Sequence, residues 1–235
     1  MATNANDAEE QVLALLCGEA ELWTWGGGTA TCEFFFKRNG TGAIAAGANQ
    51  YAWLTVDFTW SFDHQAARPV MADNGTWKFT IQMTFTTLLR LGPWRGDGAR
   101  QDNLQNPPSP SEAPFPWAPL KSAAFRPKQY TLTLSRGRFI EPFHLSIKKP
   151  FPLFQSVPYC FAPNRYASKL AFDTSPYPPR EEWVETGGLR SILDYHLDWD
   201  KKEFVRGGIS KKDETWAEML DLGWWLSPTT GFRHK

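Results

Sequence analysis

Residues 53–62 read Trp-Leu-Thr-Val-Asp-Phe-Thr-Trp-Ser-Phe, and their alternation decides the fold. From Leu54 to Phe62 every second residue is large and apolar, whereas threonine, aspartate or serine stands between. Residues 76–86 repeat the pattern. Successive side chains of a strand point to opposite faces of a sheet, so both stretches predict long strands with one apolar face. The apolar residues of the second stretch are Trp77, Phe79, Ile81, Met83 and Phe85.

Further strands are predicted on both sides of this pair, because short apolar runs end at turn-forming residues. Asn39-Gly40 favours a tight hairpin between two of them, and Arg136-Gly137 is predicted to join another two. A helix is predicted over residues 7–17, which Asp7 can cap and Gly18 can end. The additional strands are predicted over residues 20–26, 29–37, 41–47, 128–135, 138–147 and 165–173.

In the C-terminal part, the spacing of apolar residues changes from that of a strand to that of a helix. Apolar residues recur at helical spacing over 188–206 before Gly207-Gly208, and a second short helix is predicted from Asp213, so residues 188–222 form a predicted helical segment. The whole pattern predicts a mainly β fold, an antiparallel up-and-down, calycin-like β-barrel with a short N-terminal helix and a C-terminal helix. Residues 1–235 are expected to form one domain, whose closed sheet has room inside for side chains or one small ligand.

Residues 91–127 interrupt the strand pattern with eight prolines. Proline fits neither a helix interior nor a central strand, so this stretch is predicted to be an irregular insert. Two interpretations remain open: a lid at the rim of the barrel, or a segment that extends away from it.

Composition excludes several classes of protein. Lysine plus arginine and aspartate plus glutamate both count 25, so no excess of positive charge is present to bind nucleic acid. No secretory signal or membrane-spanning run is found, which predicts a cytoplasmic protein with no membrane partner. The three cysteines are widely spaced, so they are expected to be reduced, small apolar residues. They are Cys17, Cys32 and Cys160.

No metal or cofactor is expected. The four histidines have no metal-ligand spacing, and neither a phosphate-binding loop nor a Gly-x-Ser-x-Gly sequence is found. The histidines are His64, His144, His196 and His234.

The unusual composition lies in the aromatic residues, with 12 Trp, 17 Phe and 6 Tyr. On the predicted inner faces they form either a solid aromatic core or the wall of a pocket for a planar or polycyclic apolar molecule. The candidate ligand-binding residues are Trp23, Trp25, Phe58, Trp60, Trp77, Phe79, Met83 and Phe85.

Three polar residues fall on predicted apolar faces. Glu141 is in register with Phe139, and burial would raise its pKa, so it is a candidate general acid or base. In the alternative, Pro142 bends the strand at a bulge and turns Glu141 outward. Tyr130 and Tyr166 are candidates to orient a ligand carbonyl, or they fill space in the core.

The order of strands and helices resembles the lipocalin or calycin architecture, and residues 18–25 are similar in place to the Gly-x-Trp start of lipocalins. Residues 172–183, Phe-Asp-Thr-Ser-Pro-Tyr-Pro-Pro-Arg-Glu-Glu-Trp, resemble an uncharacterised family of fungal proteins, as do residues 22–28 and 126–131. The prolines of 172–183 also predict a rigid crossing that docks Tyr177 and Trp183 on the barrel. Some lipocalin-like fungal barrels are cofactor-free cyclases of natural-product pathways, and this resemblance implies such a role by analogy of fold.

The sequence therefore favours a barrel that binds a small hydrophobic metabolite and, if it is an enzyme, acts as a cofactor-independent, pericyclase-like cyclase or isomerase. Two alternatives remain open. One is a non-catalytic carrier of a hydrophobic ligand. The other is a protein-interaction scaffold, with a homodimer formed through the C-terminal residues Trp216, Trp224 and Trp225.

Overall fold

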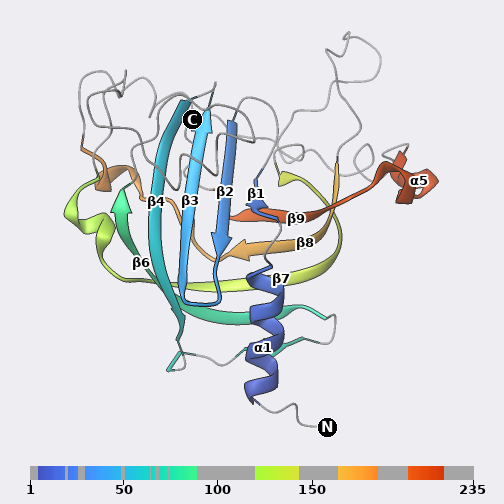
Figure 1. Ribbon diagram of the computed structural model, residues 1–235, viewed down its shortest axis with the longest axis horizontal. Helices are drawn as coiled ribbons and strands as arrows, with labels where there is room; N and C mark the ends of the chain where they lie inside the picture. Colours follow the sequence, from blue (N-terminus) through green and yellow to red (C-terminus); the bar gives the residue numbers. More distant parts are fainter. Residues whose placement is uncertain are drawn as a thin grey trace.

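Nine strands form one antiparallel sheet within the part of the chain that the computed structural model describes (Figure 1). The described residues are 5–18, 21–25, 30–48, 51–63, 65–66, 69–72, 75–88, 120–142, 164–184 and 201–219. The strands are β1 (Trp23–Thr24), β2 (Ala30–Phe36), β3 (Thr41–Ala48), β4 (Tyr51–Phe62), β5 (Val70–Met71), β6 (Trp77–Leu88), β7 (Lys128–Ile140), β8 (Arg165–Phe172) and β9 (Glu203–Ile209).

The sheet closes in a ring. The strand order is β4-β3-β2-β1-β9-β8-β7-β6-β5, and β4 also pairs with β6, so the first strand of the order meets the far side of the sheet. In Figure 1, β2, β3 and β4 stand upright while β7, β8 and β9 curve across them. The prediction of a mainly β, antiparallel fold is thereby confirmed.

The alternating strands bury one face, as their sequences predict. Along the β4–β6 pair, Phe58 lies opposite Phe85, and Trp60 lies opposite Met83. All four side chains are buried, whereas Thr59, between Phe58 and Trp60, is exposed. Directly opposite residues of an antiparallel pair share a face, so these four point to the inside of the ring.

The first hairpin is also confirmed. Gly40 has φ +79°, which glycine adopts without strain, and Asn39 accepts a hydrogen bond at Oδ1 from the Thr41 backbone N–H at 3.1 Å. A Cβ at position 40 would lie 2.9 Å from the carbonyl oxygen of Trp60. This turn therefore requires glycine both for its conformation and for its close contact with β4.

The helix α1 (Ala5–Leu16) agrees with the prediction for residues 7–17. Its buried side includes Val12 and Leu16, and Glu10 pairs with Arg38 of the β2–β3 hairpin at 2.5 Å. No helix within the described segments has the length and hydropathy needed to span a bilayer.

The predicted hairpin at Arg136-Gly137 is wrong. Residues 128–140 form the single strand β7, and the register against β8 shifts between Arg136 and Phe139. A glycine suits a bulge as well as a turn, and here it allows β7 to bend while it pairs with β6 on one side and β8 on the other.

The predicted helix over 188–206 is wrong where it can be compared. Residues 185–200 lie outside the described residues, and Glu203–Ile209 form strand β9, which pairs with both β1 and β8. This strand fills the place between two otherwise unpaired edges, so ring closure overrides the local helical spacing. Of the second predicted helix, Trp216–Met219 form α5, and residues 220–222 lie outside the described residues.

Residues 120–127 lie at the described end of the predicted insert, whose residues 91–119 are outside the described part. Leu120 bridges to Trp183, and Ser122–Phe125 form the short helix η2. Lys128 pairs with Glu182 of η3 (Arg180–Glu182) at 2.5 Å. Trp183 is buried and donates to the carbonyl of Pro178 at 2.9 Å, so the predicted docking of this crossing on the sheet is confirmed.

Candidate functional site

The predicted ligand-binding residues all lie buried in the core of the ring. None of them is more than 8% exposed, and they come from β1, β4 and β6 or their ends. The structure therefore brings them together as inner-face residues. They are Trp23, Trp25, Phe58, Trp60, Trp77, Phe79, Met83 and Phe85.

Part of this interior is filled by rings that meet across it. Phe34 of β2 lies 5.7 Å from Phe172 of β8, centroid to centroid, although β1 and β9 separate these strands in the sheet. Phe204 completes this cluster, 4.6 Å from Phe34. In the part of the interior that Phe34, Phe172 and Phe204 fill, the interpretation as a solid aromatic core holds. Neither Phe34 nor Phe204 was among the predicted site residues.

The two N-terminal tryptophans contact cations of the protein itself. The guanidinium of Arg206 lies 4.1 Å from the ring centre of Trp23, and the ammonium of Lys201 lies 3.8 Å from that of Trp25. One face of each indole is thus occupied. These pairs could not be predicted from the sequence, because no local sequence pattern distinguishes a lysine or arginine that packs against a distant aromatic ring.

Tyr130 belongs to the packed core. It is 3% exposed, and its ring lies 5.7 Å from that of Phe172 in an edge-to-face contact. Burial raises the pKa of its phenol well above the ordinary range, and the charges of Glu182 and Asp173 add to the effect. Tyr130 and Glu141 are eleven residues apart on and after one strand, roughly 35 Å along the chain, so they do not converge.

Tyr166 and Glu141 do converge, at the end of the ring. The Tyr166 hydroxyl donates to Oε2 of Glu141 at 3.4 Å, and both side chains are half-buried. Tyr166 is the second residue of β8 and lies opposite Phe139, and Glu141 follows the last residue of β7. These two residues form the candidate acid–base pair.

The observed bulge decides their register. It lies between Arg136 and Phe139, ahead of Glu141, and the pairing resumes with Phe139 opposite Tyr166. Along β8, Tyr166 is in phase with the buried Leu170 and Phe172. The register therefore keeps the pair at the rim, in phase with the core-facing residues of β8.

Burial dominates the electrostatics of the pair. It raises the pKa of the Glu141 carboxyl, against the hydrogen bond from Tyr166 and the charge of Lys211, which lower it. Burial also raises the pKa of Tyr166 to about 12, and the nearby Glu141 charge acts in the same direction. Both groups are therefore held toward their protonated forms, the form that donates a proton or a hydrogen bond.

The buried thiols Cys17 and Cys32 behave as small apolar residues, as predicted. Burial raises the pKa of Cys17 to about 11, which suppresses the reactive thiolate near neutral pH. Cys160 and all four histidines lie outside the described residues. Among the residues that are described, no group of three or more His, Cys, Asp or Glu side chains could hold a metal ion.

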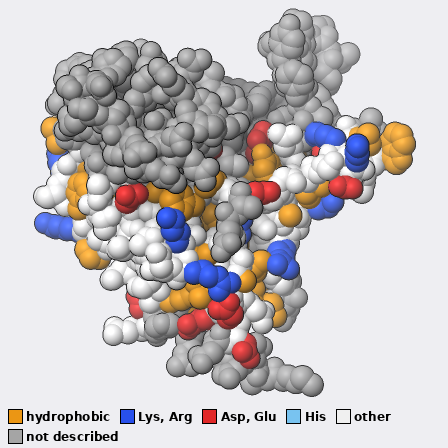
Figure 2. Space-filling model, viewed as in Figure 1, with side chains coloured by type: hydrophobic (Ala, Val, Ile, Leu, Met, Phe, Trp, Pro, Cys, Tyr) orange, Lys and Arg blue, Asp and Glu red, His pale blue; other side chains and the backbone are white. Residues whose placement is uncertain are grey.

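Lysine, arginine, aspartate and glutamate side chains are scattered over the described surface in Figure 2, with no large area of a single sign in this view. Compared with known proteins, the chain matches no family model, no curated protein and no solved structure.

Proposed function

We propose that this protein binds a small hydrophobic molecule at the rim of its ring and isomerises or cyclises it without a cofactor, with Glu141 and Tyr166 as the acid–base pair. The observation that carries the proposal is the hydrogen bond between a half-buried phenol and a half-buried carboxyl group. The neighbouring inner face is aromatic, which suits a planar or polycyclic apolar ligand.

The pair can shift a proton on a carbonyl compound. Tyr166 donates a hydrogen bond to the carbonyl oxygen while the ionised form of Glu141 removes a proton from the adjacent carbon. The carboxyl group of Glu141, whose proton exchanges with solvent, then returns a proton to another carbon of the resulting enol, so no electrons are gained or lost overall. A carboxyl group with a raised pKa is a stronger base when ionised, and it stays protonated, and so available as an acid, to a higher pH.

The filled part of the interior favours the rim as the ligand position. Phe34, Phe172 and Phe204 meet inside the ring, so a ligand there would have to displace packed rings. The rim is where polar groups accompany the apolar face. The calycin-like barrel form, the cytoplasmic location and a role in fungal secondary metabolism belong to this proposal, supported by the closed antiparallel sheet and by the motif resemblance.

Proton exchange tests the activity directly. The protein is incubated in D₂O with a tricyclic β,γ-unsaturated ketone, and NMR follows isomerisation and deuterium incorporation, while tryptophan fluorescence reports binding. We expect turnover that falls about 10²-fold or more in E141Q and in Y166F. Glu203→Gln is the matched control, because Glu203 forms its ion pair with Lys169 at 3.2 Å elsewhere on β8 and β9.

The outcomes separate the candidate functions. Binding with no exchange in the native protein would favour the carrier function and overturn the catalytic one. Exchange that is equal in E141Q and in the native protein would remove Glu141 from the mechanism. Absence of binding across a set of such polycyclic ketones would overturn both.

A second candidate function is self-association. Trp216 is 81% exposed and Met219 is 50% exposed on α5, so two large apolar side chains three residues apart lie on the described surface. The proposed binding partner of these two exposed side chains is a second copy of this chain. Sedimentation should give a dimer that W216S converts to a monomer, and a native protein that is monomeric at high concentration would rule it out.

A further inference from the structure

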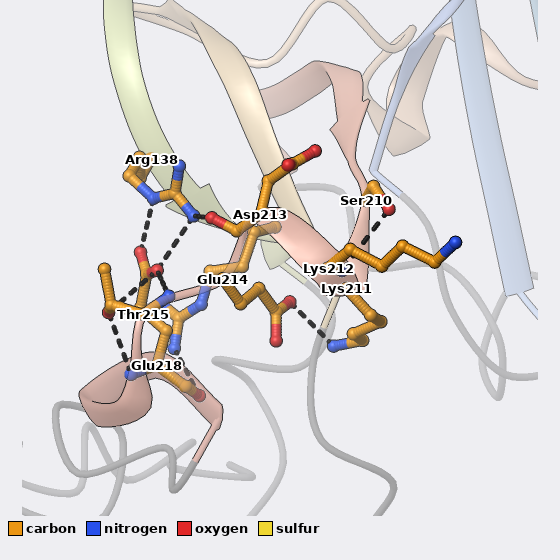
Figure 3. Close-up of polar contacts among 9 residues, drawn as sticks. Arg138, Ser210, Lys211, Lys212, Asp213, Glu214, Thr215 and Glu218 are labelled. Atoms are coloured by element: carbon orange, nitrogen blue, oxygen red, sulfur yellow. Dashed lines mark hydrogen bonds and ion pairs between the residues drawn. The ribbon is translucent and has the colours of Figure 1, made fainter.

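The segment that follows β9 is tied to the ends of two other strands. Residues 210–219, here named the clamp segment, comprise Ser210, the short helix η4 (Lys211–Asp213), Glu214, Thr215 and α5. Figure 3 shows its polar contacts with Arg138 of β7. The segment begins beside β8, because Ile209, the residue before it, pairs with Arg165.

Arg138 is the first anchor. Its Nε donates to Oε1 of Glu218 at 2.6 Å, and its Nη2 donates to Oε2 of Glu218 and to the carbonyl oxygen of Asp213, both at 2.8 Å (Figure 3). Two parallel bonds between a guanidinium and a carboxylate fix orientation as well as distance. Arg138 lies within the bulge of β7, where its side chain is free of the regular strand alternation.

Glu218 forms hydrogen bonds through its carboxylate and also through its backbone N–H. The backbone N–H of Thr215 donates to Oε2 of Glu218 at 2.8 Å, and the Glu218 N–H donates to Oγ1 of Thr215 at 3.3 Å. This reciprocal arrangement is a capping box, which satisfies N–H groups that a helix start leaves unpaired. Arg165 is the second anchor, since its Nη2 donates to the Glu218 carbonyl at 3.4 Å.

Both anchors adjoin the candidate acid–base pair. Arg138 of β7 precedes Glu141 by three residues, and Arg165 directly precedes Tyr166 on β8. The same glutamate thus joins the strand end that carries Glu141 to the strand end that carries Tyr166. From within the clamp segment, Lys211 acts on the charge of Glu141 and is itself held by Glu214 at 2.8 Å.

We propose that the clamp segment positions the Glu141–Tyr166 pair, with Arg138 and Glu218 as its positioning residues. The consequence for catalysis rests on the proposed function. The positioning itself does not, because it concerns the geometry of the unliganded protein. Tyr166, Lys211 and, beside Tyr166, Asn164 and Glu21 are the polar groups that act on the pair.

Two variants should move the pKa of Glu141 in opposite directions. R138Q releases the segment, so Glu141 gains water, and because burial is the larger influence, its pKa should fall. K211Q leaves the anchors in place and removes only an attractive charge, so the pKa of Glu141 should rise. Lys212→Gln is the matched control, since it removes the adjacent charge and should leave that pKa unchanged.

The measurement is a carboxyl ¹³C NMR titration of the full chain labelled at glutamate, with E141Q used to assign the signal. A fall in R138Q together with a rise in K211Q supports the clamp. No change, or a rise, in R138Q overturns it, and E218Q provides the same test if R138Q does not fold. The titration needs no ligand, so a clamp without catalysis is distinguishable from a failed clamp.

Discussion

The guanidinium of Arg206 stacks 4.1 Å from the ring centre of Trp23, and both side chains donate to the carbonyl oxygen of Leu16 at 3.0 Å. Leu16 is the last residue of α1, where helix carbonyls lack partners within the helix. The two inner-face residues of β9 and β1 therefore cap the helix. The positive charge of Arg206 also faces the negative end of the helix dipole.

Replacing Arg206 should loosen α1. R206A removes charge-assisted hydrogen bonds and a cation–π contact, so the free energy of unfolding should fall by about 2–3 kcal/mol. Urea denaturation followed by circular dichroism measures it. Arg126, which is exposed in the turn before β7, offers the control R126A, and its loss should change stability by less than about 0.5 kcal/mol. Equal effects of the two substitutions would refute the capping role.

Two glycines with positive φ separate the effect of backbone strain from that of steric contact. Gly40 has φ +79° and Gly75 has φ +74°, so alanine is strained at either position. Only at position 40 does a Cβ meet the protein, 2.9 Å from the Trp60 carbonyl oxygen, because nothing lies within 4 Å of a Cβ at position 75. G75A should therefore cost about 1–2 kcal/mol. G40A should cost more, and thermal unfolding that ranks G75A as the more damaging would contradict this geometry.

Strand periodicity was sufficient to predict β4 and β6, because alternate residues are buried from Leu54 to Trp60 and from Trp77 to Phe85. It failed at β9, where Phe204 and Val205 are both buried on successive positions and two glycines follow. That strand forms because β1 and β8 need a partner, which only the closed ring shows. In the same way, β1 is a strand of two residues held by its neighbours on both sides.

The sequence could predict individual residues of the candidate site, but it could not predict which of them come into contact. Glu141 and Tyr166 stood out as polar groups in phase with apolar ones, whereas their meeting depends on the bulge at Arg136–Phe139. Tyr130 carried the same signal and lies in the packed core instead. Arg138 and Glu218 are 80 residues apart, so the contact between them leaves no local pattern.

The stability of the protein should depend on the ionisation of Glu141. Its folded pKa is raised above 4.5, so the folded state binds more protons than the unfolded state, and stability must fall as pH rises from about 4.5 through the folded pKa. E141Q removes this dependence while other carboxyl groups remain. The stability advantage of E141Q over the native protein should therefore grow across that window. If the urea midpoints of E141Q and the native protein differ by the same amount at every pH, burial does not raise the pKa of Glu141 enough to affect stability.

Phe34 tests how completely rings fill the interior. Its side chain is fully buried and contacts rings from three other parts of the chain, those of Phe172, Tyr177 and Phe204. F34A leaves a cavity that neighbours on separate strands cannot close, so the loss should be about 3–5 kcal/mol, whereas F34L should cost less because it keeps most of the volume. An apolar cavity of this kind stays dry and binds small aromatic molecules, so benzene should raise the melting temperature of F34A and leave that of the native protein unchanged. If benzene stabilises the native protein equally, the ring already encloses free volume, and the ligand position inside it would replace the rim.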